Sequence, residues 1–236
     1  MNLFEKLVAL ALLPASILLA QTSSLPASQI SSALRAGNLD QALHLADQAL
    51  ATSPHDPQLW ALKGIALSAQ KHSKEALDAY HQSLKLSPNY LPALEGAAQI
   101  EYDTGNAEAV TLLKRIAELR PADQTSHAML ASIAYKQGHC KDAVAEFEKS
   151  PQLMASEAGA LQEYGACLLR LKQPDKAVAA FQQLLRAHPD DPRARRALAT
   201  VQLATNQASE SLSTLQPLVA SGDVPALQLA ASAHET

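Results

Sequence analysis

Apolar residues recur three and four positions apart in segments that lie between helix breakers such as Gly37, Gly105 and Gly138. This spacing brings the apolar side chains to one face of a helix, so each segment predicts an amphipathic helix of about twelve to fifteen residues. No segment shows the strict alternation that is typical of a strand. The pattern therefore predicts an all-α protein.

The helical segments repeat along the chain with a period of 34 residues, broken by a single step of 33. One set of positions carries small residues: Ala42, Ala76, Ala109, Ala143, Ala177 and Ser211. Four residues later, most copies carry a larger apolar side chain: Ala46, Tyr80, Leu113, Phe147, Phe181 and Leu215. Each pair of helices leaves apolar surface uncovered, so the pairs must stack on their neighbours to bury it.

These positions resemble the tetratricopeptide repeat, whose motif is matched best by Trp60, Gly64, Ala76, Tyr80 and Pro88. The resemblance extends over roughly residues 23–225 and implies a right-handed superhelical solenoid of stacked antiparallel helix hairpins. We expect about six repeats and the start of a seventh inside a domain of residues 21–236. The expected repeats are 23–56, 57–90, 91–123, 124–157, 158–191 and 192–225.

Three copies depart from the motif. The third lacks one residue near Asn106, which predicts a shorter turn between its two helices. The fourth carries Pro151 where its second helix should continue, so we expect that helix to end near Lys149, with a looser connection through Met154. The sixth carries Arg195 at a large apolar position of its first helix, which leaves the packing of that repeat unexplained.

The first twenty residues differ in kind from the repeats. A weakly basic start with Lys6 is followed by an apolar run from Leu7 to Leu19, and Ala20 precedes polar residues. This order resembles a secretory signal peptide, with an apolar run shorter than a membrane span needs. We expect cleavage after Ala20 and a periplasmic or secreted chain without a membrane span. A retained anchor is the alternative.

The last segment, Val224 to Ala233, predicts the first helix of a further repeat and is almost entirely apolar. Repeat arrays usually close with a polar capping helix. We therefore expect either a longer array, of which this chain is a fragment, or a partner that covers this helix, including a second copy of the chain.

Composition and motifs argue against nucleic-acid binding, catalysis and metal binding. The net charge is −4 with dispersed Lys and Arg, which does not suit a nucleic-acid binder. The sequence contains no HExxH, GxSxG, CxxC or phosphate-binding loop, so we expect no enzyme activity and no cofactor. The eight histidines lack the spacing of metal ligands, and the adjacent pair His139 and Cys140 fits a solvated turn, so no metal site is predicted.

The two cysteines fall on helices that the repeat architecture makes antiparallel neighbours. Cys140 begins the second helix of the fourth repeat, and Cys167 lies near the end of the first helix of the fifth. A disulfide would staple adjacent repeats and contribute about 3 kcal/mol in an oxidising compartment. The alternative is two free buried thiols that act as small apolar residues.

The resemblance implies a partner-binding groove on the concave surface, which the first helix of each repeat lines. Tyrosine and arginine often anchor such contacts. The candidate residues are Glu95, Gln99, Tyr102, Tyr135, Lys136, Arg170, Arg193 and Arg196. We expect a non-catalytic scaffold that binds a protein or peptide there, with an acidic end of the ligand near the arginines. The alternative is a structural spacer or self-associating segment of a larger envelope or secretion assembly.

Overall fold

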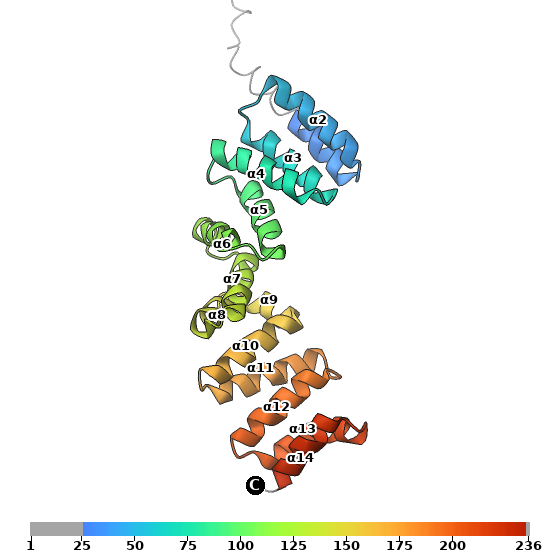
Figure 1. The fold of residues 1–236 in the computed structure, drawn as a ribbon, viewed down its shortest axis with the longest axis vertical. Helices are drawn as coiled ribbons and strands as arrows, with labels where there is room; N and C mark the ends of the chain where they lie inside the picture. The colour runs from blue at the N-terminus through green and yellow to red at the C-terminus, as the bar shows by residue number, and fades with distance from the viewer. Residues whose placement is uncertain (1–25, 235–236) are drawn as a thin grey trace, which may run out of the picture. The chain divides into compact units, whose positions relative to one another are not determined.

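The computed structural model describes residues 26–234, which form helices and contain no strand (Figure 1). The predicted signal peptide, residues 1–20, lies outside the described residues. The chain divides into two compact units, residues 1–112 and 113–236. Within residues 26–234, no helix combines the length and apolarity needed to cross a membrane.

The first unit holds two complete helix hairpins and the beginning of a third. Residues 26–35 are helical and are followed by α2 (Leu39–Thr52), α3 (Pro57–Ala69), α4 (Ser73–Leu86), α5 (Leu91–Asp103) and the start of α6 (Glu108–Leu119). Helix α3 packs against both α2 and α4, and α4 packs against α5 (Figure 1). Each hairpin therefore buries its apolar face on the next one.

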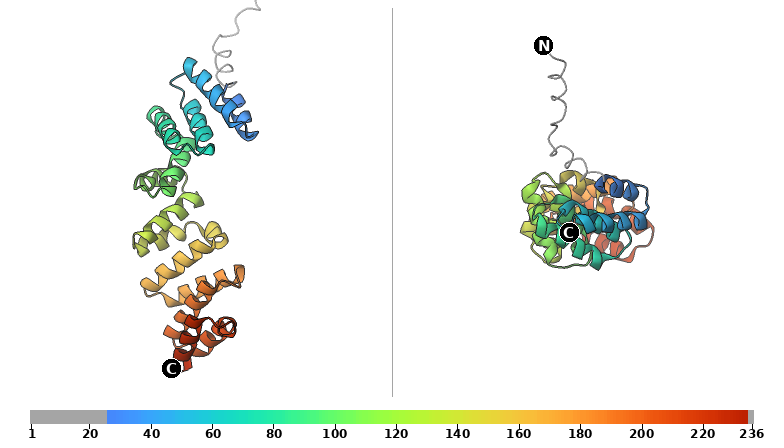
Figure 2. Two further views of the ribbon diagram at one scale, coloured as in Figure 1. Left: turned by 45° about the vertical axis from the view of Figure 1, so that its right-hand side comes forward. Right: turned by 90° about the horizontal axis from the view of Figure 1, so that it is seen from above.

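The second unit continues the same order. Its helices are α7 (Gln124–Lys136), α8 (Cys140–Phe147), α9 (Pro151–Ser156), α10 (Ala158–Arg170), α11 (Pro174–Ala187), α12 (Pro192–Ala204), α13 (Ala208–Ala220) and α14 (Val224–His234). Successive helices from α10 to α14 pack on one another, as both Figure 1 and the left view of Figure 2 show. The core here is built around Phe147, Leu168 and Phe181.

The turn inside each hairpin repeats one backbone geometry. After α3, Lys71 adopts a φ of 64°, and the amide of His72 donates to the carbonyl of Leu67 at 2.9 Å. After α7, Gly138 has a φ of 80°, and the amide of His139 donates to Ala134 at 2.8 Å. This left-handed residue and the bond spanning five residues end a helix sharply. The geometry is the same with or without glycine.

Small residues let one aromatic ring enter between helices. Tyr80 of α4 is 2% exposed. A Cβ atom at Gly64 of α3 would lie 2.6 Å from Tyr80 Cδ1, and one at Gly96 of α5 would lie 2.2 Å from Tyr80 Cζ. The ring therefore occupies the space that a side chain at either glycine would need. Gly165 and Phe181 repeat this arrangement between α10 and α11, at 2.7 Å.

A hydrogen bond to the proline that closes the preceding repeat recurs through the chain. Its donors occupy equivalent repeat positions, and each meets the carbonyl six residues earlier: Trp60 with Pro54, His127 with Pro121 and Arg195 with Pro189. Arg195 also donates to the carbonyl of Thr214 at 3.3 Å. The packing of the sixth repeat is thus explained, because Arg195 supplies the same donor as the Trp60 indole.

His127 carries a second contact that ties α7 to α8. Its ring is 5% exposed, with Nδ1 2.6 Å from Glu146 Oε2 and Nε2 3.1 Å from the Pro121 carbonyl oxygen. Both ring nitrogens therefore face oxygen atoms that accept hydrogen bonds. Burial alone would raise the pKa of Glu146, but hydrogen bonds from Lys149 and His127 outweigh it and hold that pKa below its usual value.

The third repeat corrects one prediction. Four residues, 104–107, separate α5 from α6, whereas three separate α3 from α4, so the turn is longer rather than shorter. Gly105 ends α5 in the usual way, with the amide of Asn106 donating to Glu101 at 2.8 Å. The one-residue deletion therefore shortens the first turn of α6.

The fourth repeat corrects another. Helix α8 ends at Phe147, within two residues of the predicted end near Lys149, but the connection that we expected to be loose forms the short helix α9. Proline suits the first position of a helix because its missing amide hydrogen has no partner there. The side chain of Gln124 accepts hydrogen bonds from the amides of Gln152 and Leu153 at 2.9 and 3.2 Å, which fastens α9 to α7.

Candidate functional site

Three of the predicted binding residues lie along α5 in the first unit. Glu95 and Gln99 are exposed and Tyr102 is half-buried. Their spacing of four and three residues brings them to one face of the helix. Gln99 Nε2 donates to Asp103 Oδ1 at 2.9 Å. This face offers carboxylate, amide and phenol groups for contact with a partner.

The second unit brings three further predicted residues together at the ends of α7 and α10. The guanidinium of Arg170 lies 5.7 Å from the centroid of the Tyr135 ring, a cation–π distance. Lys136 is exposed beside Tyr135 in the chain. Because Tyr135 and Arg170 come from adjacent repeats, the contact spans two repeats and gives a surface that is aromatic and cationic.

A carboxylate that the sequence analysis did not select adjoins this group. Ser132 Oγ of α7 donates to Glu163 Oε1 of α10 at 3.3 Å. Burial raises the pKa of Glu163, against the hydrogen bond from Ser132 and the charge of Lys136. Equivalent positions in other repeats hold the uncharged residues Leu62, Gly96 and Met129. A charged residue at this position is therefore the sequence signal that could have identified Glu163.

We name these residues the α7–α10 surface: Ser132, Tyr135, Lys136, Glu163 and Arg170. It lies over the cysteines, which the structure joins in a disulfide between Cys140 of α8 and Cys167 of α10, with Cα atoms 4.8 Å apart. Arg170 Nη1 lies 3.9 Å from Cys140 Sγ. The bridge therefore fixes the end of α10, from which Arg170 extends.

The two predicted arginines of α12 have different environments. Arg196 Nη1 lies 2.7 Å from Asp223 Oδ2, and both side chains are largely buried, at 27% and 22% exposure. Asp223 Oδ1 also accepts from the amide of Ala226 at 2.9 Å and so caps α14. Arg193 is exposed near the start of α12. Arg196 thus holds α14 in place, whereas Arg193 faces solvent.

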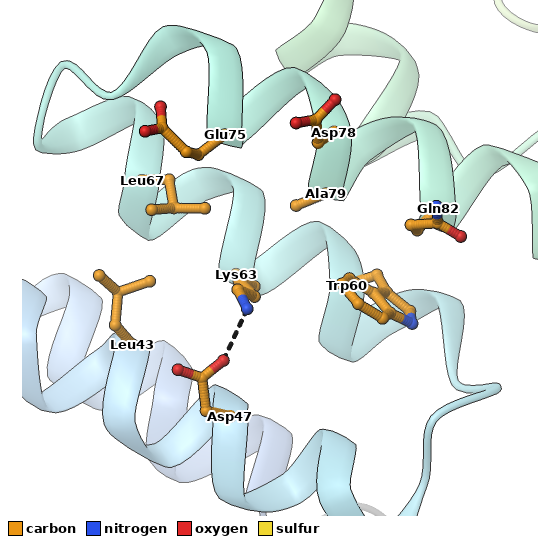
Figure 3. Close-up of a pocket in the computed structure, with 9 residues that line it drawn as sticks. All are labelled: Leu43, Asp47, Trp60, Lys63, Leu67, Glu75, Asp78, Ala79 and Gln82. Carbon is orange, nitrogen blue, oxygen red and sulfur yellow. Dashed lines mark hydrogen bonds and ion pairs between the residues drawn. The ribbon is translucent and has the colours of Figure 1, made fainter.

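A cleft of about 630 Å³ in the first unit was not foreseen. Lys63 of α3 bridges it to Asp47 of α2 at 2.7 Å and lies 5.6 Å from the centroid of the Trp60 ring (Figure 3). Glu75 and Asp78 of α4 line the other side. None of the residues predicted to bind a partner lines this cleft, which has more acidic than basic groups.

Comparison with protein families decides the class of the chain. The family model for the cytochrome c-type biogenesis protein H TPR domain matches residues 40–161, and a tetratricopeptide-repeat model matches residues 168–233. The chain belongs to the tetratricopeptide-repeat family. The fold of this family is a protein–protein interaction scaffold and is generally not enzymatic.

Curated relatives share the repeats but are much longer. The chain is 29% identical over 153 residues to a CTR9 homologue of Arabidopsis thaliana, covering 64% of this chain and 11% of that protein. It is 26% identical over 175 residues to the TPR repeat-containing thioredoxin TTL4 of the same plant, covering 67% of this chain and 25% of that protein. The chain thus spans a quarter or less of these relatives.

Solved structures of other tetratricopeptide-repeat proteins share the fold. YrrB, a TPR protein with an unusual peptide-binding site, has a TM-score of 0.66 at 18% identity, covering 81% of this chain and 98% of that one. Pseudomonas aeruginosa pilF has a TM-score of 0.63 at 16% identity, covering 90% and 98%. MamA has a TM-score of 0.60 at 18% identity, covering 73% and 91%. The predicted all-α repeat fold is confirmed.

Proposed function

We propose that this tetratricopeptide-repeat chain is a non-catalytic scaffold that binds an extended protein or peptide segment on the face formed by the first helices of its repeats. The observation that carries the proposal is the α7–α10 surface, where Tyr135, Lys136 and Arg170 converge from two repeats. Tyrosine and arginine are the residue types that most often dominate binding energy. The repeats are already stacked, so binding costs little ordering.

The chemistry of the surface favours a segment with acidic side chains. Lys136 and Arg170 supply two cations, and the Tyr135 ring supplies a flat apolar contact. Glu163 is held partly inside the surface by Ser132, so it accepts hydrogen bonds from the segment's backbone amides. Binding should therefore weaken as ionic strength rises, because exposed charges are screened by salt.

Variant-dependent capture tests this proposal. The purified chain is cross-linked to proteins of its source cell, in parallel with the variant Tyr135→Ala, Arg170→Ala. A matched control, Lys141→Ala, Arg186→Ala, removes exposed cations from the second helices α8 and α11. We expect the partner to be lost in the first variant and kept in the control, while circular dichroism shows both folded. Equal capture by all three proteins would contradict the proposal.

We also propose that the chain is exported, with residues 1–20 acting as a signal peptide. The support is the apolar run from Leu7 to Leu19 that ends in Ala20 before polar residues. Cell fractionation and mass determination of the chain from its native host test this. An N-terminus at Gln21 outside the cytoplasm is expected, and a cytoplasmic chain that keeps residues 1–20 would contradict it.

Self-association is the second candidate function, because α14 exposes large apolar side chains. Val224 is 62% exposed and Leu227 is 44% exposed. A second copy that covers them would remove this apolar area from water. Sedimentation at increasing concentration distinguishes the two functions. A mass that rises with concentration and returns to one chain in the variant Leu227→Glu favours self-association, and one chain throughout favours the groove alone.

A further inference from the structure

Three potential metal ligands meet in the first unit, at the point where α4, α5 and α6 come together. They are His81 of α4, Glu101 of α5 and Glu108 at the start of α6, and one ligand atom of each lies within 4.8 Å of the other two. His81 Nε2 and Glu108 Oε1 are 3.8 Å apart. One imidazole nitrogen and two carboxylates form a set that suits a divalent transition metal.

Glu101 distinguishes this group from an exposed acidic patch. It is only 4% exposed, and its carboxylate makes no hydrogen bond or ion pair within the described residues, although its oxygens keep contact with solvent. Burying a carboxylate without a partner is unfavourable. The same carboxylate lies beside His81 and Glu108. A cation bound between the three side chains would compensate the buried charge.

The equivalent position in the sixth repeat shows how a buried polar group is satisfied without a cation. Gln202, at 5% exposure, accepts a hydrogen bond from Thr214 Oγ1 at 2.8 Å. In the third repeat the position that matches Thr214 is Leu112, which has no donor in its side chain. Other repeats avoid the problem with Leu67 or Leu168 in place of Glu101. Glu101 thus lacks the donor on the second helix that Gln202 has.

We propose that His81, Glu101 and Glu108 bind one divalent transition-metal ion, for which Zn²⁺ is the fitting probe. Ligands around tetrahedral Zn²⁺ lie about 3.4 Å apart, given bond lengths of about 2.0–2.1 Å. The side chains of His81 and Glu108 are 42% and 48% exposed, so they can rotate to close the remaining separation. Their exposure also leaves the fourth position to water. The ion would fasten α4 to the start of α6.

This metal site could not be predicted from the sequence. His81 and Glu101 are twenty positions apart, Glu101 and Glu108 are seven positions apart, and the three residues lie on three different helices. The absence of a metal-ligand spacing along the chain led the sequence analysis to predict no metal site. Only the stacking of three helices brings the ligands together.

Zn²⁺ titration of the untagged, chelator-stripped full chain tests the proposal. Calorimetry should show one tight site, and thermal unfolding should shift to higher temperature with Zn²⁺. His81→Gln, Glu101→Gln and Glu108→Gln should each weaken the affinity at least about tenfold, since even the loss of an outer-shell partner costs that much. The control His44→Gln, Glu75→Gln removes an exposed histidine and an exposed carboxylate elsewhere and should bind like the parent.

Glu101→Gln also separates a metal ligand from a structural carboxylate. Without metal, this variant should unfold at a temperature equal to or above that of the parent, because a neutral amide replaces an unpaired buried charge. It should then fail to respond to Zn²⁺. The proposal is overturned if the parent shows no tight site, or if Glu101→Gln binds Zn²⁺ as well as the parent. It is equally overturned if the control loses binding to the same extent.

Discussion

The prediction with the closest contact concerns Gly96→Ala, which places a methyl group against the buried ring of Tyr80. The new Cβ would lie 2.2 Å from Tyr80 Cζ, where non-bonded carbons need about 3.5–4 Å. The ring cannot retreat, because a Cβ position at Gly64 on its other side is already only 2.6 Å from Tyr80 Cδ1. Helix α5 must therefore move away from α4 by roughly 1 Å.

The magnitude follows from two opposing effects. Overpacking a core costs about 1–3 kcal/mol, and the blocked ring places this site at the upper end. Alanine in place of glycine in a helix returns up to about 1 kcal/mol. We expect a net loss of about 2 kcal/mol. Gly159→Ala is the matched control, because nothing lies within 4 Å of its Cβ position on α10, so it should be neutral or stabilising.

Urea unfolding followed by fluorescence and circular dichroism provides the assay. Trp60 is the single tryptophan and lies on α3, which packs against α4, so its fluorescence reports on the unfolding of this part of the chain. Gly96→Ala should lower the fluorescence midpoint, and Gly159→Ala should leave it unchanged. In the Tyr80→Leu background, the cost of Gly96→Ala should shrink by at least about 1 kcal/mol. Equal midpoints for the two glycine variants, or an undiminished cost in that background, would refute the reasoning.

Three further predictions address titration and the disulfide. Burial raises the pKa of Tyr80 to about 12, with a hydrogen bond involving Ser68 opposing it, so the native state should lose stability as pH rises from 10 towards 12. Tyr80→Phe should flatten this loss in urea midpoints, and an unchanged slope would contradict it. Because the pKa of Glu146 is lowered in the native state, its contribution to native-state stability is complete above about pH 4.5. That contribution is lost as the pH falls through the pKa that Glu146 has in the native state. Glu146→Gln should reduce that acid-side loss. His127→Gln should cost about 1–3 kcal/mol at neutral pH, because it removes the buried one of the two hydrogen-bond partners of the Glu146 carboxylate. Urea titration at several pH values measures both effects. Cys140→Ser should cost about 3 kcal/mol for a loop with a sequence separation of 27, and the difference from the parent should largely disappear under reductant.

The helix pattern was predictable because it depends on local chemistry. Apolar spacing set the helices, and the period placed Tyr135 and Arg170 on neighbouring first helices, where the structure brings them into contact. The positions of Cys140 and Cys167 likewise followed from the antiparallel order of α8 and α10. In each case a repeated local geometry carried the information.

Features that depend on a particular side chain crossing between helices were not predictable. Arg195 occupies a position that is apolar in the repeat motif, which left its packing unexplained from the sequence. In the structure it makes the hydrogen bond to a proline carbonyl that Trp60 makes in the second repeat. Arg196 was predicted to contact a partner, and the structure adds that it pairs with Asp223 at the start of α14. The one-residue deletion shortened α6 rather than the turn, because Gly105 preserves the end of α5. The first two outcomes rest on three-dimensional contacts that repeat alignment does not encode.

Site-specific photo-cross-linking tests the scaffold account most directly. A photoreactive residue in place of Lys136 reports contacts of the α7–α10 surface, and one in place of Arg186 reports contacts of the second helix α11. The account predicts that a partner protein is captured from the source cell at the first position and not at the second, with less capture at high salt. Equal capture at both positions, or capture of only a second copy of the chain, would contradict a partner-binding role for this surface.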